Sequence, residues 1–304
     1  FRGRCFYTPN KSLYISAFAA LGLEQGLELL TQFLVATKQR FYVEIFEEDK
    51  TAREVIEALG LKWYATKISA GSEIKGVYSL RGGEELPPEE AATLEEMQRP
   101  YLTSSEMDGI RGGLAEHEAH LWAQHYSSYN KRQSWTAFAL RGYNENDPSF
   151  IIKPAEMSKA WRAENSMYKN ATSQWTGAAR LFPKAVEIAR RFVSDDSQID
   201  RLRFMRLSAK KGELARHADI TDREAGVQDG RIARLHIPIH SSDKVTLYGW
   251  THRGEIIERK FKEGGLYYLD QRKPHRVINE GGQERVHLVL DVRSSEKVRE
   301  LLRA

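Results

Sequence analysis

The chain has 304 residues, of which 41% are hydrophobic and 29% charged, and its formal net charge is +4 at pH 7. This is the composition of an ordinary globular protein, which excludes wholesale disorder, and the length allows a large core and suggests two domains. The positive charge is mild. It falls short of the concentrated basic face that nucleic-acid binding needs, so we do not expect nucleic acid as a partner.

The chain contains one cysteine, Cys5. It therefore has no internal disulfide and no cysteine-based metal site, which fits a reducing compartment, and we expect the cytoplasm. No apolar run approaches the roughly 20 residues of a membrane helix, and no secretory signal is visible, so no membrane partner is expected. Because the sequence begins at Phe1 and not at a methionine, we expect that a few residues precede it.

Residues 1–80 alternate strand-like and helical patterns, which predicts a small α/β module. A helical pattern at 51–59 is followed by Gly60, a suitable C-cap. Strand-like runs occur at 41–46, 63–68 and 76–80. This order faintly resembles the C-terminal half of an acetyltransferase-like fold, but no Gly-rich phosphate-binding loop accompanies it. We expect a non-catalytic module for docking, substrate gating or homo-oligomerisation.

Residues 81–100 differ in composition from their surroundings. They contain Gly82-Gly83, Pro87-Pro88 and six glutamates between positions 84 and 96. This composition is typical of an exposed linker. We therefore expect an acidic linker between the first module and a catalytic domain that spans 101–304.

Short strand-like segments follow one another closely in the last hundred residues. Glycines break the series at Gly254, Gly264-Gly265 and Gly281-Gly282. The candidate strands are 203–207, 233–239, 245–250, 255–261, 266–269, 277–278 and 285–292. Many short antiparallel strands in one domain predict a sandwich or a jelly roll, with helical patterns upstream at 155–169 and 176–193. The expected fold class is mainly β with flanking helices.

Two potential metal ligands, His217 and Asp219, stand two residues apart. On an extended segment, residues i and i+2 project to the same face, so the imidazole and the carboxylate can converge on one ion. His275 follows after a predicted strand. Two histidines and one carboxylate on one side of a metal leave the opposite positions free, which is the arrangement of non-haem Fe(II) oxygenases. The first pair alone is weak evidence, because a loop hydrogen bond would explain it better.

Arg285 lies on an apolar predicted strand, ten residues after His275. A buried arginine is costly unless it meets an anion, and its planar guanidinium suits a bidentate carboxylate such as the far end of 2-oxoglutarate. On an edge strand the same residue would face solvent, but the three possible ligands upstream favour the cosubstrate interpretation. His287 shares a face with Arg285 and lies either in the site or packed in the core.

Several stretches of the chain resemble the aspartyl/asparaginyl β-hydroxylase family of Fe(II)/2-oxoglutarate-dependent oxygenases. They are RLSAKKGELARHADIT, GRIARLHIPI, EGGLYYLDQRKPHRVIN and ERVHLVLDV, with QSWTAFALRGYN fitting the opening strand. The resemblance covers roughly residues 130–295. It implies a double-stranded β-helix, a cupin-like variant of the jelly roll. It also implies an enzyme that binds Fe(II) at His217, Asp219 and His275 and uses O₂ to convert 2-oxoglutarate to succinate and CO₂ while hydroxylating an unactivated C–H bond.

The resemblance implies further contacts to 2-oxoglutarate beside Arg285. The arginine and histidine that hold it in this family correspond to Arg234 and His236, which share one face of their strand by alternation. On the preceding strand, Arg206 and Ser208 also share a face, and they fall where family members contact the cosubstrate.

Asp219 separates subgroups of the family. The resemblance implies glycine at this position in the vertebrate peptidyl hydroxylases and aspartate in bacterial amino-acid hydroxylases, whereas halogenases need a small residue that makes room for chloride. We therefore expect a small polar substrate, an amino acid or a derivative of one. Trp135, Arg141 and Tyr143, on the opening strand, are candidate substrate contacts, although a core or solvent-facing role would explain them as well.

Three other functions stay open at this point. The first is hydroxylation of Asp, Asn or another residue in a protein. The second is a non-catalytic cupin-like binding module, against which Asp219 and Arg285 argue, since such a module needs no arginine at the cosubstrate position. The third is an acetyltransferase-like enzyme centred on the first 80 residues, against which the missing phosphate loop counts.

Overall fold

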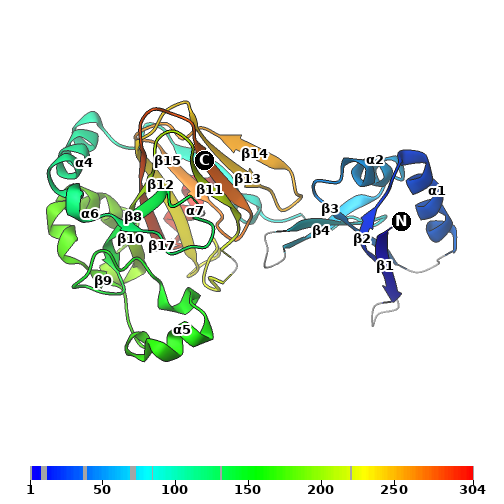
Figure 1. Cartoon of the computed structure of the whole chain (residues 1–304), viewed down its shortest axis with the longest axis horizontal. Coiled ribbons are helices and arrows are strands. Elements are labelled where there is room, and N and C mark those ends of the chain that lie inside the picture. Colours follow the sequence, from blue (N-terminus) through cyan, green and yellow to red (C-terminus); the bar gives the residue numbers. More distant parts are fainter. Residues whose placement is uncertain are drawn as a thin grey trace. The chain divides into compact units, whose positions relative to one another are not determined.

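The computed structural model describes residues 2–7, 12–36, 40–68, 73–83, 85–130, 132–219 and 221–303. They form two compact units (Figure 1). The first comprises Phe1–Leu86 together with Trp250–Ile256, and the second comprises Pro87–Gly249 and Ile257–Ala304. None of the helices within the described ranges has the length and hydropathy needed to cross a membrane.

The first unit is an α/β module in which one sheet packs against two helices. The sheet order is β1-β2-β3-β5-β4, antiparallel except for the parallel β2–β3 pair. The elements are β1 Arg2–Tyr7, β2 Leu13–Ala19, α1 Leu23–Ala36, β3 Phe41–Phe46, α2 Lys50–Ala58, β4 Lys62–Ile68 and β5 Ile74–Ser79. Alternation along β3 turns Val43 toward Leu30 of α1 and Val55 of α2, and these residues form the core. The predicted strands and the predicted helix of this region are confirmed to within two residues.

The range 81–100, predicted as an exposed linker, divides between the two units. Its described residues up to Pro87 carry no helix or strand. Its second half contains α3, Pro88–Ala91, and β6, Leu94–Gln98, which pairs with β15, Leu266–Leu269. Leu94 is fully buried there. Apolar burial thus outweighs the acidic composition, and the second half of the range is a strand of the next unit.

The second unit is a sandwich of two antiparallel sheets, which confirms the predicted jelly-roll class. The large sheet has the order β6-β15-β12-β17-β10-β8-β7, with β9 paired to β8, and the small sheet has the order β11-β16-β13-β14. The remaining strands of the large sheet are β7 Ala123–Gln124, β8 Trp135–Gly142, β9 Gln174–Trp175, β10 Ile199–Leu207, β12 Ile232–His240 and β17 Arg285–Arg293. The small sheet contains β11 Gly212–His217, β13 Val245–Trp250, β14 Ile256–Arg259 and β16 His275–Asn279.

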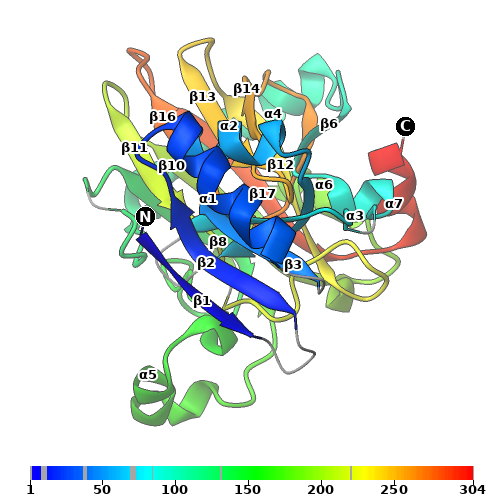
Figure 2. The same ribbon diagram turned by 90° about the vertical axis from the view of Figure 1, so that its right-hand side faces the viewer.

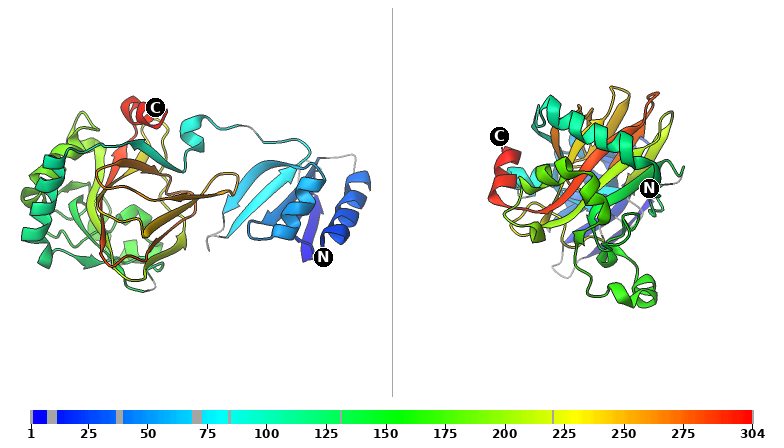
Figure 3. Two further views of the ribbon diagram at one scale, coloured as in Figure 1. Left: turned by 90° about the horizontal axis from the view of Figure 1, so that it is seen from above. Right: turned by 90° about the vertical axis from the view of Figure 1, so that its left-hand side faces the viewer.

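Helices cover the outer face of the large sheet (Figure 3). Ile110 of α4, Ser104–His117, and Ile188 of α6, Pro183–Arg190, pack there against the sheet. The other helical segments are η1 Glu118–His120, η2 Pro154–Glu156, α5 Lys159–Glu164, η3 Ser166–Tyr168, η4 Gly177–Leu181, η5 Asp196–Gln198 and α7 Glu296–Arg303. The two helical patterns predicted between β8 and β10 thus form as shorter segments. α5 projects away from both sheets (Figure 2).

Alternation along β17 separates two cores. Leu288 packs outward with the helices, whereas Val289 packs inward with residues of the small sheet. Arg285, His287 and Asp291 lie two or four residues from Val289, so their side chains point to the same face of β17 as Val289. These polar side chains therefore face the space between the two sheets. That space is where the predicted site residues must meet.

Candidate active site

Two predicted metal ligands lie opposite one another on neighbouring strands of the small sheet. His217 is the last residue of β11, His275 is the first of β16, and the two are paired in register. Both are buried, and their ring centroids are 4.2 Å apart. Antiparallel pairing thus brings together two histidines that are far apart in the sequence.

The backbone determines which nitrogen of each ring is free. Nδ1 of His217 lies 2.9 Å from the carbonyl oxygen of Ala215, and Nδ1 of His275 lies 2.9 Å from that of Lys273. Because a carbonyl oxygen only accepts, each Nδ1 carries the proton and each Nε2 keeps its lone pair. Burial lowers the pKa of both rings, to about 3 for His275, so both stay in the neutral form that binds a metal.

Asp219 follows β11, and its carboxylate completes the cluster. Oδ1 lies 3.7 Å from Nε2 of His217, and Oδ2 accepts a hydrogen bond of 2.8 Å from Nη1 of Arg234. Burial acts to raise the pKa of Asp219, but the charge of Arg234 and the electrostatic interactions with His217 and His275, together with the Arg234 hydrogen bond, outweigh it and the pKa falls to about 2. One ligand atom from each of the three residues lies within 4.8 Å of the others. Two neutral nitrogens and one anionic oxygen on one side of a shared ion fit Fe(II).

Arg285 is 4% exposed at the start of β17. Its Nη2 donates to Nδ1 of His287 at 2.6 Å, and its Nε has no hydrogen-bond partner among the described residues. Burial lowers its pKa to about 9. A buried cation with an unsatisfied N–H is costly, and a bound anion would supply what it lacks.

Arg285 and the three possible metal ligands line one cavity between the sheets. His236 also lines it, and Nε2 of this residue has no hydrogen-bond partner within the described ranges. The lining consists of Leu94, Trp135, Met205, Leu214, His217, Asp219, Arg234, His236, Leu247, Tyr248, Leu269, His275, Arg276, Val277 and Arg285. A metal-binding set and buried unpaired nitrogens in one mainly apolar cavity fit a metal together with a dicarboxylate such as 2-oxoglutarate.

Arg234 reaches the cavity, but its guanidinium is held by carboxylates. Nε and Nη2 donate to Asp291 at 2.7 and 3.1 Å, and Nη1 donates to Asp219. The fully buried Asp291 also accepts hydrogen bonds from Arg201 at 2.8 Å and Arg203 at 2.7 Å. The structure thus places Arg234 as a support for the carboxylate of Asp219, in addition to any contact with a cosubstrate.

The structure does not bring Arg206 or Ser208 to the cavity, although both were expected to contact the cosubstrate. Arg206 donates to the hydroxyl of Thr136 at 3.1 Å, and Ser208 donates to the carbonyl oxygen of Ser134 at 2.9 Å. The reason is that successive side chains of β10 alternate between its two faces. Met205 lines the cavity, so its neighbour Arg206 points to the opposite face of the sheet.

Of the three expected substrate contacts, Trp135 lines the cavity and the other two do not. The buried Arg141 donates to two backbone carbonyl oxygens at 2.8 and 2.9 Å. Tyr143 donates to Asp200 and lines a separate pocket of about 590 Å³ beside α5. Both residues hold β8 to neighbouring segments and do not face the candidate metal site.

Some residues at the site gave little or no sequence signal. Tyr129 comes from the loop before β8 and stacks on His217 with a centroid distance of 4.7 Å. Asp291 ends an apolar run, and only the register of β17 with β10 and β12 places it among arginines. Alternation from Arg285, which already put His287 on the same face, was the signal that could also have placed Asp291 there.

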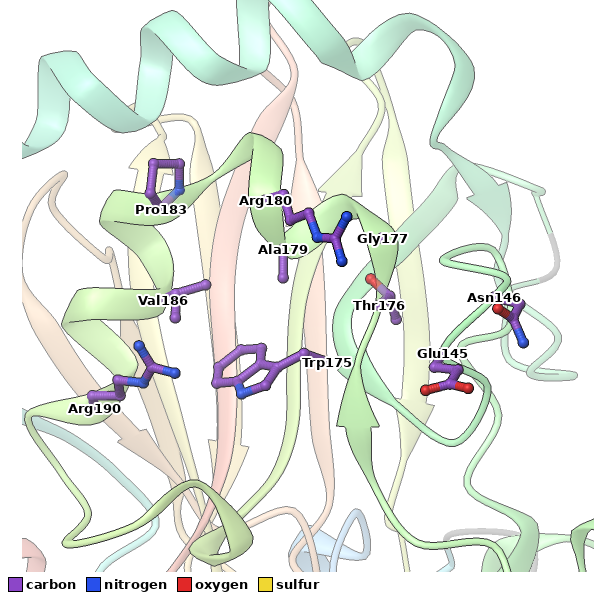
Figure 4. Close-up of a pocket in the computed structure, with 10 residues that line it drawn as sticks. All are labelled: Glu145, Asn146, Trp175, Thr176, Gly177, Ala179, Arg180, Pro183, Val186 and Arg190. Atoms are coloured by element: carbon purple, nitrogen blue, oxygen red, sulfur yellow. The ribbon is translucent and has the colours of Figure 1, made fainter.

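A pocket of about 760 Å³ lies elsewhere on the second unit, with Trp175 at its centre (Figure 4). Its basic residues are Arg180 and Arg190, and Arg190 is already paired with Asp196. Among its lining residues, Glu145 is the one side chain of a metal-binding type. Although this pocket is large, its chemistry is poorer, so we place the candidate site in the cavity between the sheets.

The family model of the aspartyl/asparaginyl β-hydroxylases matches residues 106–295, which is more than half of the chain. A comparison with curated proteins finds no match. Similar solved structures include a prolyl-4-hydroxylase from Pseudomonas putida, which is 13% identical with a TM-score of 0.36 over 66% of this chain and 92% of that chain. Another is a 2OG-Fe(II) oxygenase family oxidoreductase from Burkholderia pseudomallei, 11% identical with a TM-score of 0.41 over 64% and 81%. The TM-scores and identities of these solved structures are too low to support a function, so the family membership of this chain depends on the family model alone.

Proposed function

This chain belongs to the aspartyl/asparaginyl β-hydroxylase family, and from that premise we propose that the cavity between its sheets is the active site of an Fe(II)/2-oxoglutarate-dependent hydroxylase. In this proposal His217, Asp219 and His275 hold Fe(II), and Arg285 binds the far carboxylate of 2-oxoglutarate. The observation that carries the proposal is that the metal-binding triad and a buried, incompletely bonded arginine line the same cavity.

Bound Fe(II) supplies, with O₂ and 2-oxoglutarate, the oxidising chemistry that converts a C–H bond to C–OH and yields succinate and CO₂. His217, Asp219 and His275 would supply three donors to the metal, and a set of only three protein donors would leave positions open for the cosubstrate and O₂. Tyr129 stacks on His217 and restrains its ring. Apolar side chains such as Leu214 and Leu247 form the wall and exclude water.

Arg285 and His236 are the residues that would hold 2-oxoglutarate. The guanidinium of Arg285 offers donors in a planar fork that matches a carboxylate, and its buried Nε lacks a partner in the described structure. His236 lies on β12, one strand away, with its Nε2 also unpartnered in the described ranges. A dicarboxylate would satisfy both residues.

Arg234 sets how Asp219 would bind the metal. Because Arg234 holds Oδ2 at 2.8 Å, Oδ1 is left on the side of His217. Oδ1 would therefore be the oxygen that Asp219 offers to the metal, and the Arg234 hydrogen bond would fix its orientation. A carboxylate held in this position fills the metal site that a halogenase leaves open for chloride, so the arrangement supports hydroxylation.

We propose a small polar substrate, an amino acid or a derivative of one. The support is the presence of Asp219, which by resemblance is a feature of the amino-acid hydroxylases of the family. Trp135 and Tyr248 line the cavity and offer an aromatic wall and a hydroxyl group for such a molecule.

The test measures succinate formation from 2-oxoglutarate by the Fe(II)-loaded protein, with a panel of free amino acids and a panel of peptides that contain Asp or Asn. We expect stimulation by a free amino acid; stimulation by peptides alone would assign the enzyme to protein hydroxylation. His217→Ala should abolish turnover, while His120→Gln, at an exposed histidine of η1, should not. Under anaerobic conditions, 2-oxoglutarate should give the iron-to-ligand charge-transfer band. A wild-type protein with neither the band nor succinate refutes the proposal.

A further inference from the structure

His287 is a fully buried histidine between the two residues assigned to 2-oxoglutarate. Its Nδ1 lies 2.6 Å from Nη2 of Arg285 on the same strand, and 3.4 Å from Nδ1 of His236 on β12. Phe261 stacks on the His287 ring at a centroid distance of 5.8 Å and an angle of 13°, which restrains the ring plane. Nδ1 of His287 therefore contacts both Arg285 and His236.

The donors and acceptors in this contact determine the tautomers. A guanidinium only donates, so Nδ1 of His287 is unprotonated and accepts from Arg285. Nδ1 of His236 faces the same lone pair, and two lone pairs would repel each other. His236 therefore carries its proton on Nδ1 and directs it at His287.

The consequence falls on the other nitrogen of His236. In a neutral imidazole with its proton on Nδ1, Nε2 is a bare acceptor. This is the atom without a hydrogen-bond partner within the described ranges, on a residue that lines the cavity. A carboxylate also only accepts. It can bond Nε2 of His236 only when that nitrogen has gained a proton.

The surroundings keep His236 neutral until an anion arrives. The titratable and charged groups around it are Arg285, His287 and Asp291 of β17, Arg234 of β12, His275 of β16 and Tyr267 of β15. Burial, followed by the positive charges of Arg285 and Arg234, holds the pKa of His236 well below its ordinary value, and Asp291 opposes this only in part. A dianion in the cavity offsets both arginines and favours the imidazolium form.

We propose that His287 is a positioning residue that orients Arg285 and His236, and that 2-oxoglutarate binding brings one proton from solvent to Nε2 of His236. This inference rests on the proposed function. The proton is taken up when the anion enters, no covalent bond changes, and the bound state contains the imidazolium, the dianion and the guanidinium of Arg285.

The experiment is titration calorimetry of the Mn(II)-loaded protein with 2-oxoglutarate, in buffers of different ionisation enthalpy. We expect uptake of about one proton per bound molecule, and a Kd that rises about tenfold per pH unit between the pKa values of His236 in the free and bound states. Tight binding without proton uptake overturns the inference and leaves the proposed function intact. Failure of 2-oxoglutarate to bind at any pH overturns the proposed function instead.

Two substitutions at His287 separate positioning from packing. In His287→Leu the acceptor is lost, so we expect the affinity for 2-oxoglutarate to fall about tenfold. Proton uptake should also disappear, because His236 is then free to move its single proton to Nε2. In His287→Gln the amide oxygen replaces the acceptor, and affinity and uptake should largely be restored. A purely structural role predicts weaker binding by His287→Leu with uptake unchanged, which contradicts the proposal.

His236→Gln provides the complementary control. The glutamine amide donates to a carboxylate without titrating, so we expect 2-oxoglutarate to bind without proton uptake and with a Kd that does not change with pH. Persistence of the full uptake in this variant would place the proton elsewhere and refute the assignment to His236. His120→Gln, which removes an exposed histidine, should retain both affinity and uptake.

Discussion

At one end of the site, Asp219 in the cavity wall and Asp291, which shares the guanidinium of Arg234 with it, accept hydrogen bonds from arginines, and Asp291 alone receives them from three. At the other end, Arg285 and His236 are also buried, but each keeps a nitrogen with no partner in the described structure. The hydrogen-bonded carboxylates and arginines form a fixed support for the metal ligands. The unpaired nitrogens of Arg285 and His236 are available to bind a ligand. We call these the metal end and the cosubstrate end.

The largest effect on stability is expected at the metal end. Asp291→Asn removes the charge that three buried arginines share, and breaking buried pairs of this kind costs about 3–5 kcal/mol. The free energy of unfolding, measured in urea, should fall by that amount. The double variant Asp291→Asn/Arg203→Met, which also removes one of the stranded cations, should recover part of the loss. A loss below about 1 kcal/mol would show that the cluster does not support the fold.

At the cosubstrate end, Arg285→Ala should weaken 2-oxoglutarate binding about 100-fold, because it removes the charged partner of a buried carboxylate. The affinity for Mn(II), used in place of Fe(II), should stay within about twofold, since no hydrogen bond joins Arg285 to a metal ligand in the described structure. The measurement is a pair of titrations, one with Mn(II) and one with 2-oxoglutarate. Equal losses in both would mean that the carboxylate anchor has been misplaced.

Arg234→Lys tests which end Arg234 serves. Lysine cannot bond Asp219 and Asp291 together as the guanidinium does, so metal affinity should fall about 10-fold, at the lower limit for residues that orient a metal ligand. The affinity for 2-oxoglutarate should change less. The opposite ranking would assign Arg234 mainly to the cosubstrate, as the family resemblance implies.

The smallest effect is expected for Arg206→Gln. Arg206 faces the outer side of β10, so activity and 2-oxoglutarate affinity should stay within about twofold of the wild type. Surface substitutions of this kind usually change the free energy of unfolding by no more than about 0.5 kcal/mol. Steady-state turnover at limiting 2-oxoglutarate provides the check. A loss comparable to that of Arg285→Ala would show that the face of β10 is wrongly assigned here.

The sequence was sufficient to bring together residues whose positions follow from local spacing and from the family resemblance. The spacing of His217 and Asp219 predicted a shared face, the resemblance added His275 and Arg285, and all four line one cavity. Arg206, expected at the cosubstrate from the resemblance, lies away from the cavity, and its strand gave no warning because β10 carries buried apolar residues on both faces. Met205, and not Arg206, reaches the cavity.

Other features depended on long-range register. Arg201 and Asp291 meet only because β10 and β17 pair as they do, and no local pattern encodes that register. Arg141 was a candidate substrate contact, but its guanidinium donates to backbone carbonyl oxygens of segments that are remote in sequence. In the same way β6 forms within an acidic stretch, because its two apolar residues, Leu94 and Met97, are buried against the second unit.

The turn Trp250–Ile256 groups with the first unit, although it joins β13 to β14 of the small sheet. Within that unit the hydroxyl of Thr66 donates to the carbonyl oxygen of His252. Two separate segments of the chain therefore belong to the first unit. Tyr248, two residues before the second segment begins, lines the cavity. Removing the chain up to Leu86 would leave this turn without the residues that shape it. Any loss of turnover in a truncated protein would therefore not by itself assign a catalytic role to the first unit, and substitutions within that unit are the better test of what it does.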